Sequence, residues 1–194
     1  MDINKASLLL INIISEEKEV HTRHIARLLN ISPTTASSIL TKLYKNKILE
    51  VKQKGKNKIY SLRKSIITFK LLLLAKEYEA INFLESNFIL KQFFEDLIKT
   101  IKEYTDSILV FGSYAKKIQT SKSDLDILVL IKNYSYIKKI DLLLKEFSNT
   151  YGTKLHQQII TLDDFKKNLD KPLNKEILTK NICIYGTETF LGEL

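Results

Sequence analysis

Two short patterns near the middle of the chain could together bind a phosphate and a metal ion. Gly112 and Ser113 end one apolar run, and Asp124 and Asp126 open another after a gap of ten residues. A Gly-Ser turn leaving a buried strand can place backbone N–H groups and a hydroxyl against a phosphate. Two aspartates at i and i+2 of a strand project from one face, where they can hold Mg²⁺ or Mn²⁺. The patterns predict a phosphate cradle at Gly112 and Ser113 followed by a metal site at Asp124 and Asp126, where a bound cation would in turn hold the phosphates of a nucleotide.

The elements that must position these residues are predicted to be strands. The runs 107–111 and 125–131 are rich in Ile, Leu and Val and have the length of buried strands. Further along the chain we expect a helix over 136–149, a strand over 154–160, and short helices over 162–169 and 173–180. Together these elements predict a three-stranded mixed sheet with helices packed on it.

The sequence around both patterns resembles a known family. The segments Ile108–Ala115 and Ser123–Val129 contain a Gly-Ser-x10-Asp-x-Asp signature and are similar to the minimal nucleotidyltransferases of the polymerase-beta superfamily. The resemblance covers residues 104–192 and includes Ile184–Phe190, which is similar to the family's last strand. It implies transfer of a nucleoside monophosphate from a metal-bound nucleoside triphosphate to an acceptor, with Asp124 and Asp126 as catalytic residues. In some relatives, which are antitoxins, the acceptor is a partner toxin protein.

The chain departs from this family at one position. The resemblance implies a third carboxylate on the strand after Asp-x-Asp, which helps to bind metal and accepts the proton of the attacking hydroxyl. The matching strand instead offers His156 and Gln158 on one face, and it contains no Asp or Glu. We interpret His156 as a solvated strand residue, although an imidazole can act as a base. Asp163 and Asp164 come after the strand, where we expect them to cap the next helix.

This departure leaves three interpretations of the second half open. It could belong to a transcription regulator that senses a metal-bound nucleotide, to an active nucleotidyltransferase with a protein acceptor, or to an inactive scaffold for dimerisation. The missing carboxylate favours the regulator over the enzyme. The intact Gly112-Ser113 and Asp124/Asp126 set disfavours the scaffold. Whether the domain is active, and with which nucleotide, stays open.

A helix-turn-helix is predicted within the first sixty-five residues. Residues 21–30 have the apolar spacing of a short helix with Thr22 as its N-cap. A second helix is expected from Pro33 to Lys45, with Ser32 as its cap and proline at the first helical position. Small polar residues and lysines line the outer face of this second helix, as in a helix that reads DNA bases.

A basic hairpin follows and completes the pattern. Two strands are predicted over 48–52 and 58–62, with the turn at Gly55. Residues 30–62 resemble the winged-helix regulators of the multiple-antibiotic-resistance and arsenic-repressor types, and the lysines of such a wing would contact phosphates or the minor groove. The predicted contacts to double-stranded DNA are Arg23, Thr34, Thr35, Ser38, Lys42, Lys45, Lys54, Lys56 and Lys58, with Lys52 beside them. The alternative is a winged helix that binds another protein.

The distribution of charge favours DNA. The chain has a formal net charge of +9, and residues 1–65 hold 13 Lys and Arg against 5 Asp and Glu. Residues 66–194 hold 18 against 17 and are nearly neutral. A basic first part joined to a neutral second part indicates that the first part meets a polyanion.

Residues 66–104 are predicted to be helical. They contain neither Gly nor Pro and form one long helix or two, with a break near Ser86 and Asn87. Their apolar face needs a partner. We prefer a helix that makes a homodimer, in which Leu74 and Phe93 would lie at the interface. A helical layer between domains is the alternative.

These observations define an α+β protein. The expected domains are a winged helix over 1–65, a helical connector over 66–104, and a nucleotidyltransferase-like domain with a small mixed sheet over 105–194. The longest uninterrupted apolar stretch, 71–75, is far below a membrane span of ~20 residues. The single cysteine, Cys183, fits a reducing compartment, so we expect a cytoplasmic protein without membrane partners.

Overall fold

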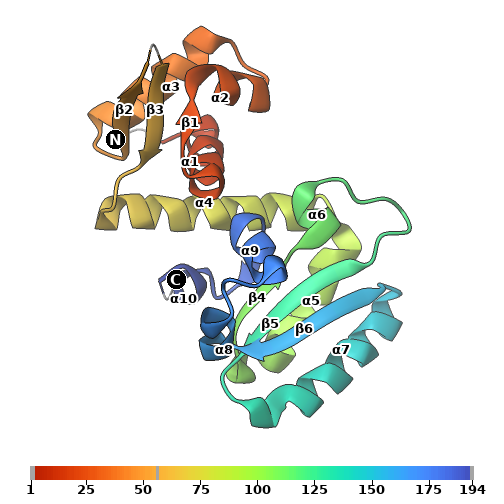
Figure 1. The fold of residues 1–194 in the computed structure, drawn as a ribbon. Coiled ribbons are helices and arrows are strands. Elements are labelled where there is room, and N and C mark those ends of the chain that lie inside the picture. The colour runs from red at the N-terminus through yellow and green to blue at the C-terminus, as the bar shows by residue number, and fades with distance from the viewer. Residues whose placement is uncertain (1–2, 56, 193–194) are drawn as a thin grey trace. The chain divides into compact units, whose positions relative to one another are not determined.

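The computed structural model describes residues 3–55 and 57–192. The chain forms two compact units, Met1–Tyr78 and Glu79–Leu194. No helix within the described ranges is both long and apolar enough to cross a lipid bilayer. Each unit has its own sheet and its own core, as the α+β class predicts (Figure 1).

The first unit is a winged helix. Its elements are α1 (Lys5–Glu17), β1 (Val20–His21), α2 (Thr22–Leu28), α3 (Pro33–Lys45), β2 (Leu49–Lys54), β3 (Asn57–Leu62) and the start of α4 (Ile66–Glu85). The sheet is antiparallel with the order β1-β3-β2, so the hairpin β2–β3 is joined by a short third strand that the sequence did not reveal. The core is drawn from every helix of the unit, including Ile11, Ile25 and Leu40.

Local capping explains where the two middle helices begin. Ser32 accepts a hydrogen bond from the Thr35 N–H at 3.0 Å, and Pro33 occupies the first helical position, as predicted. The prediction for α2 was wrong by one residue. His21 is the N-cap, and its Nδ1 accepts from the His24 N–H at 3.1 Å, while Thr22 is already helical.

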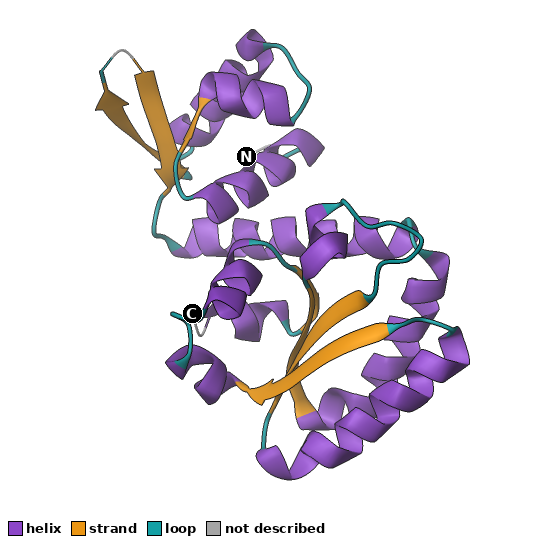
Figure 2. Cartoon of the chain, turned by 45° about the vertical axis from the view of Figure 1, so that its right-hand side comes forward, coloured by secondary structure: helices purple, strands orange, loops and turns teal. Residues whose placement is uncertain are grey.

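The second unit is a four-stranded mixed sheet covered by helices. After the end of α4, its elements are α5 (Phe88–Ile101), η1 (Lys102–Tyr104), β4 (Thr105–Val110), α6 (Gly112–Lys116), β5 (Leu125–Ile131), η2 (Tyr134–Tyr136), α7 (Ile137–Tyr151), β6 (Leu155–Thr161), α8 (Leu162–Lys167), α9 (Pro172–Thr179), β7 (Ile182–Tyr185) and α10 (Thr187–Gly192). The strand order is β6-β5-β4-β7, and only β5 and β6 are parallel. Figure 2 shows these strands with helices on both sides.

The alternation of β5 sorts its side chains between two cores. Leu125, Ile127 and Val129 are buried in the cluster that contains residues of α5 and α7. Leu128 and Leu130 point the other way, into a cluster with residues of α8, α9 and α10. Asp126 shares the parity of this second set, so it stands on the face that α8, α9 and α10 cover.

Three expectations for this half need correction. The sheet has four strands, because Ile182–Tyr185 pairs with β4 as β7. The segment 184–190 therefore contains the end of that strand and most of α10, and not a strand throughout. Phe93 is fully buried in the core beside Phe94, so it cannot lie at a dimer interface. The break between α4 and α5 falls at Ser86 and Asn87, where the sequence indicated it.

Candidate nucleotide site and nucleic-acid interface

Gly112 is fitted directly against the carboxylate of Asp126. The chain just before Gly112 is joined to β5 by a hydrogen bond in which the Phe111 N–H donates to the Asp126 carbonyl at 3.0 Å. Gly112 has a φ of +63°, and a Cβ built on it would overlap the Asp126 side chain. Only glycine combines this backbone conformation with this close approach. The structure therefore brings together one member of each predicted pattern.

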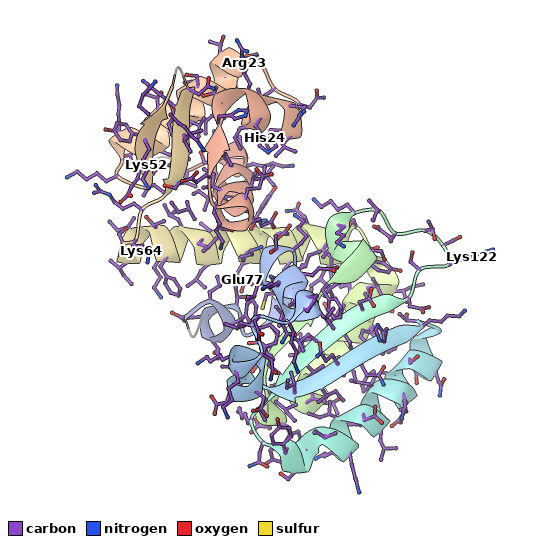
Figure 3. All side chains as sticks on the ribbon, viewed as in Figure 1. Arg23, His24, Lys52, Lys64, Glu77 and Lys122 are labelled. Carbon is purple, nitrogen blue, oxygen red and sulfur yellow. The ribbon has the colours of Figure 1, made fainter. Side chains whose placement is uncertain are left out.

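Ser113 follows in the first turn of α6. The first N–H groups of a helix have no partner within that helix, so the backbone at Gly112 and Ser113 keeps donors that a phosphate oxygen can accept from. Lysines follow nearby in sequence at 116, 117 and 122. Lys116 forms an ion pair with Glu176 at 2.8 Å, while Lys122 lies exposed on the loop between α6 and β5 (Figure 3).

The two aspartates differ in their surroundings. Asp126 is the second residue of β5 and is 23% exposed. Asp124 comes just before the strand and is exposed, and its side chain has no hydrogen bond or ion pair with any residue that the structure describes. Asp124 is therefore open to a cation, whereas Asp126 is held against Gly112 and has a second neighbour.

That neighbour is His156, which the sequence analysis interpreted as a solvated strand residue and did not pair with Asp126. In the parallel pairing of β5 and β6, Asp126 lies in register with His156. His156 donates through Nδ1 to Asp126 Oδ1 at 2.9 Å and remains 71% exposed. The signal was available, because parallel neighbouring strands place residues of the same parity on the same face. His156 thus occupies the place next to the predicted metal ligands Asp124 and Asp126 where the family resemblance implies a third carboxylate.

Asp163 and Asp164 do not supply that carboxylate, and neither is the predicted cap. Thr161 is the N-cap of α8, and its hydroxyl accepts from the Asp164 N–H at 3.3 Å. The two aspartates lie in the first turn of this helix, where negative charge is favoured by the helix dipole.

The site fits a magnesium ion that is bound mainly by a nucleotide. No group of three or more His, Cys, Asp or Glu side chains suited to a metal occurs in residues 3–55 and 57–192. Asp124 and Asp126 nevertheless provide carboxylate oxygens at the start of one strand. Mg²⁺ commonly uses one or two carboxylates together with the phosphates of its substrate. The donor set therefore suits a metal that arrives with a triphosphate better than a metal held by protein alone.

The exposed face of α3 forms the surface predicted to read DNA. Thr34, Ser38, Lys42 and Lys45 are exposed and line a shallow groove of about 810 Å³. Ser37, Thr41 and Asn46 line the same groove and were not among the predicted contacts. Thr35 is also exposed, but its hydroxyl lies 2.8 Å from Ser32 Oγ, so it is used in the helix cap.

The wing presents lysines on both of its strands. Lys54 ends β2, Lys58 lies in β3, and Lys52 is labelled in Figure 3; all three are exposed. The predicted contact Lys56 lies outside the described residues. Arg23 is exposed on α2 next to His24, which contacts Glu17 at 2.6 Å and Arg27 at 3.1 Å.

Residues 95–190 match the family model for polymerase beta nucleotidyltransferases. The match spans 96 of the 194 residues, all of them in the second unit, so this part of the chain is a domain similar to the polymerase beta nucleotidyltransferases. A protein of Methanocaldococcus jannaschii named as a putative protein adenylyltransferase is 28% identical over 89 residues. The matched segment makes up 46% of this chain and 88% of the relative. The family resemblance of the sequence is thereby confirmed.

Solved structures with partial similarity include a bacterial repressor. The adhesin competence repressor AdcR of Streptococcus pyogenes gives a TM-score of 0.41 at 12% identity, covering 53% of this chain and 76% of the repressor. A mutant of ZitR from Lactococcus lactis gives 0.35 at 15% identity, covering 76% and 77%. These scores are too low to carry an argument, so the winged-helix assignment rests on the topology of the first unit itself.

Proposed function

We propose that this protein is a DNA-binding regulator whose second unit binds a nucleoside triphosphate together with Mg²⁺ or Mn²⁺. The close fit of Gly112 against Asp126, with Asp124 open beside it, is the observation that carries the nucleotide part. The Gly112 and Ser113 backbone would hold phosphate oxygens, and Asp124 and Asp126 would hold the cation. When bound, the cation neutralises charge on the triphosphate.

The DNA part of the proposal rests on the first unit. The exposed side chains of α3 would contact base edges in the major groove, and the wing lysines would contact phosphates. Such regulators commonly bind two-fold symmetric sites, so we propose that the protein acts as a homodimer. The single cysteine is buried, which fits a cytoplasmic location.

A second function, nucleotidyl transfer to a protein acceptor, is favoured by the relative from Methanocaldococcus jannaschii. In that reaction an acceptor hydroxyl attacks the α-phosphate and pyrophosphate leaves. Asp126 and the Gly112 turn would orient the phosphates. With His156 in the place of a third carboxylate, we expect transfer to be slow without a specific partner protein.

Thermal melting with metals and nucleotides tests the first function. Mg²⁺ or Mn²⁺ should raise the melting temperature, because a cation relieves the repulsion between Asp124 and Asp126, and a triphosphate should raise it further. The double variant Asp124→Asn, Asp126→Asn should stay folded and lose both gains. Asp170→Asn, which removes one carboxylate at an exposed position away from the site, should keep both gains.

Labelled triphosphates separate the two functions. Binding without label transfer, in the presence of cell extract as a source of acceptors, supports the regulator. Rapid transfer that is lost in Asp124→Asn would establish the enzyme instead. An unchanged melting temperature with every metal and nucleotide would refute both.

A further inference from the structure

Helix α4 carries an exposed apolar stripe. Ile67, Leu74 and Ile81 are 56%, 50% and 55% exposed, although each is a large hydrophobic residue. They recur every seven residues, which places them along one side of the helix. Buried residues of α4, such as Ala80 and Phe83, lie on the other side. A stripe of this kind on a helix indicates a second helix as its partner.

Charged residues alternate with the stripe. Lys70 and Glu77 are exposed and fall at the positions between Ile67, Leu74 and Ile81. Glu77 is labelled on α4 in Figure 3. The resulting spacing of three and four residues is that of the a and d positions of a heptad, with apolar residues at a and charges at d.

The order of these five residues is nearly symmetric about Leu74. Ile67 and Ile81 lie seven residues before and after it. Lys70 lies four residues before it and Glu77 three residues after it, and these two carry opposite charges. A two-fold axis beside Leu74 that reverses the helix direction would therefore place apolar residues of one helix opposite apolar residues of the other. It would likewise place each positive residue opposite a negative one.

We infer that α4 pairs with the α4 of a second copy of this chain in an antiparallel arrangement centred on Leu74. Along one edge of the contact, Ile67 of each chain lies near Ile81 of the other, and the two Leu74 side chains meet. Along the other edge, Lys70 of each chain lies beside Glu77 of the other. Opposite charges attract across such a contact, and this decides the direction of the pairing.

A parallel pairing of the same stripe would be unfavourable. It would set Lys70 against Lys70 and Glu77 against Glu77, because a parallel pair matches each position with itself. The charge pattern is thus complementary to a reversed copy of itself and not to a parallel copy in register. The inference rests on the dimeric part of the proposed function, and it specifies which surface forms the dimer.

Cysteine cross-linking distinguishes the two directions. Leu74→Cys should form a disulfide-linked dimer under mild oxidation. Ile67→Cys and Ile81→Cys should each stay unlinked alone and should cross-link when the two proteins are mixed and allowed to exchange subunits. The unmodified protein is the control, since its one cysteine, Cys183, is buried. Cross-linking of Ile67→Cys with itself would overturn the antiparallel arrangement.

Charge reversal gives an independent test by sedimentation. Lys70→Glu and Glu77→Lys should each weaken the dimer by roughly tenfold, because each creates two like-charge contacts, and the double variant should restore it. In a parallel pair neither single reversal would change the stability of the dimer, since like charges would face each other before and after the substitution.

Leu74→Glu should also dissociate the dimer, whereas Leu142→Glu, at an exposed leucine of α7, should leave it intact. Circular dichroism should show both variants folded, because both leucines are at least half exposed. Monomers at all concentrations, or a dimer that Leu74→Glu does not affect, would overturn the inference. Either result would leave nucleotide and DNA binding to be judged from their own assays, since those assays use other residues.

Discussion

His156 Nδ1 lies 2.9 Å from Asp126 Oδ1, across the only pair of parallel strands in the described part of the chain. This contact joins a predicted metal ligand to the residue that replaces the family's third carboxylate. It holds the imidazole on the face of the sheet that carries Asp126, although the ring is largely exposed. The chemistry of the site therefore depends on what stands at position 156.

Replacing His156 by aspartate should increase nucleotidyl transfer. An added carboxylate beside Asp126 can bind metal and accept the proton of the attacking hydroxyl, and a positioned base typically contributes about 10²-fold or more. Label transfer from a triphosphate is the measurement. His156→Asn, which supplies no carboxylate, is the matched control and should show no gain. The apo form of His156→Asp should also melt earlier, because carboxylates at this distance repel each other, and Mg²⁺ should reverse that loss. Equal transfer by both variants would show that position 156 does not limit the reaction.

Gly112→Ala should destabilise the second unit and abolish nucleotide binding. The new Cβ would overlap the Asp126 carboxylate at a residue with φ of +63°. Gly152→Ala is the matched control, since Gly152 has φ of +61° and the Cβ that alanine adds there would meet nothing within 4 Å. The control should lose only about 1 kcal/mol of unfolding free energy, which is the cost of the backbone conformation alone. Chemical denaturation measures both. Equal losses of unfolding free energy in the two variants would mean that contact between the new Cβ and the Asp126 carboxylate does not destabilise the fold.

Replacing Lys54 and Lys58 by alanine should weaken binding to all DNA sequences alike. Two lost phosphate contacts should lower the slope of log affinity against log salt by about 2. Lys138→Ala with Lys175→Ala removes the same charge from exposed positions of the second unit and should leave the slope unchanged. Fluorescence anisotropy over a range of salt concentrations measures the slope. An equal effect of both double variants would point to net charge and not to the wing.

Asp106→Asn should stabilise the protein at neutral pH. Burial raises the pKa of Asp106, with Asp163 adding to this and Lys132 opposing it. A carboxyl whose folded pKa lies above its unfolded pKa destabilises the fold when it ionises. The stability cost appears as pH rises through the interval between the two values and persists above it.

The gain from Asp106→Asn should accordingly vanish below the ordinary aspartate pKa. Asp141→Asn should behave in the opposite way. Hydrogen bonds from Lys145 and Gln157 lower the pKa of Asp141, so its ionised form stabilises the fold above the unfolded pKa and the benefit is lost as pH falls. Denaturation curves from acidic to neutral pH compare the two variants. A gain for Asp106→Asn that is the same at every pH would exclude ionisation as its cause.

Residue patterns predicted the elements of this protein well where capping or periodicity was strong. Ser32 and Pro33 marked the start of α3, and the apolar run 125–131 marked the buried strand β5. The patterns failed where the outcome depends on pairing between distant segments. Val20–His21 is too short to show periodicity and becomes a strand only because β3 lies next to it. Ile182–Tyr185 likewise becomes the edge strand β7 through its pairing with β4.

The candidate site shows the same division. Gly112, Ser113, Asp124 and Asp126 were recognisable from spacing alone, because all four lie at the two ends of one strand-to-strand connection. The contribution of His156 was not, since it depends on the register between β5 and a strand thirty residues away. Thr35 illustrates a smaller limit. Its position on the outer face of α3 was right, but its hydroxyl is used by Ser32.

The fit of Gly112 against Asp126 also restricts the order in which substitutions could accumulate at these two positions. A larger residue at 112 cannot be accepted while Asp126 keeps its carboxylate, since the two would occupy the same space. A smaller residue at 126 would remove that steric barrier, but it would remove a proposed metal ligand at the same step. A lineage that abandoned the nucleotide would therefore change position 126 first and position 112 afterwards. In this chain neither change has been made.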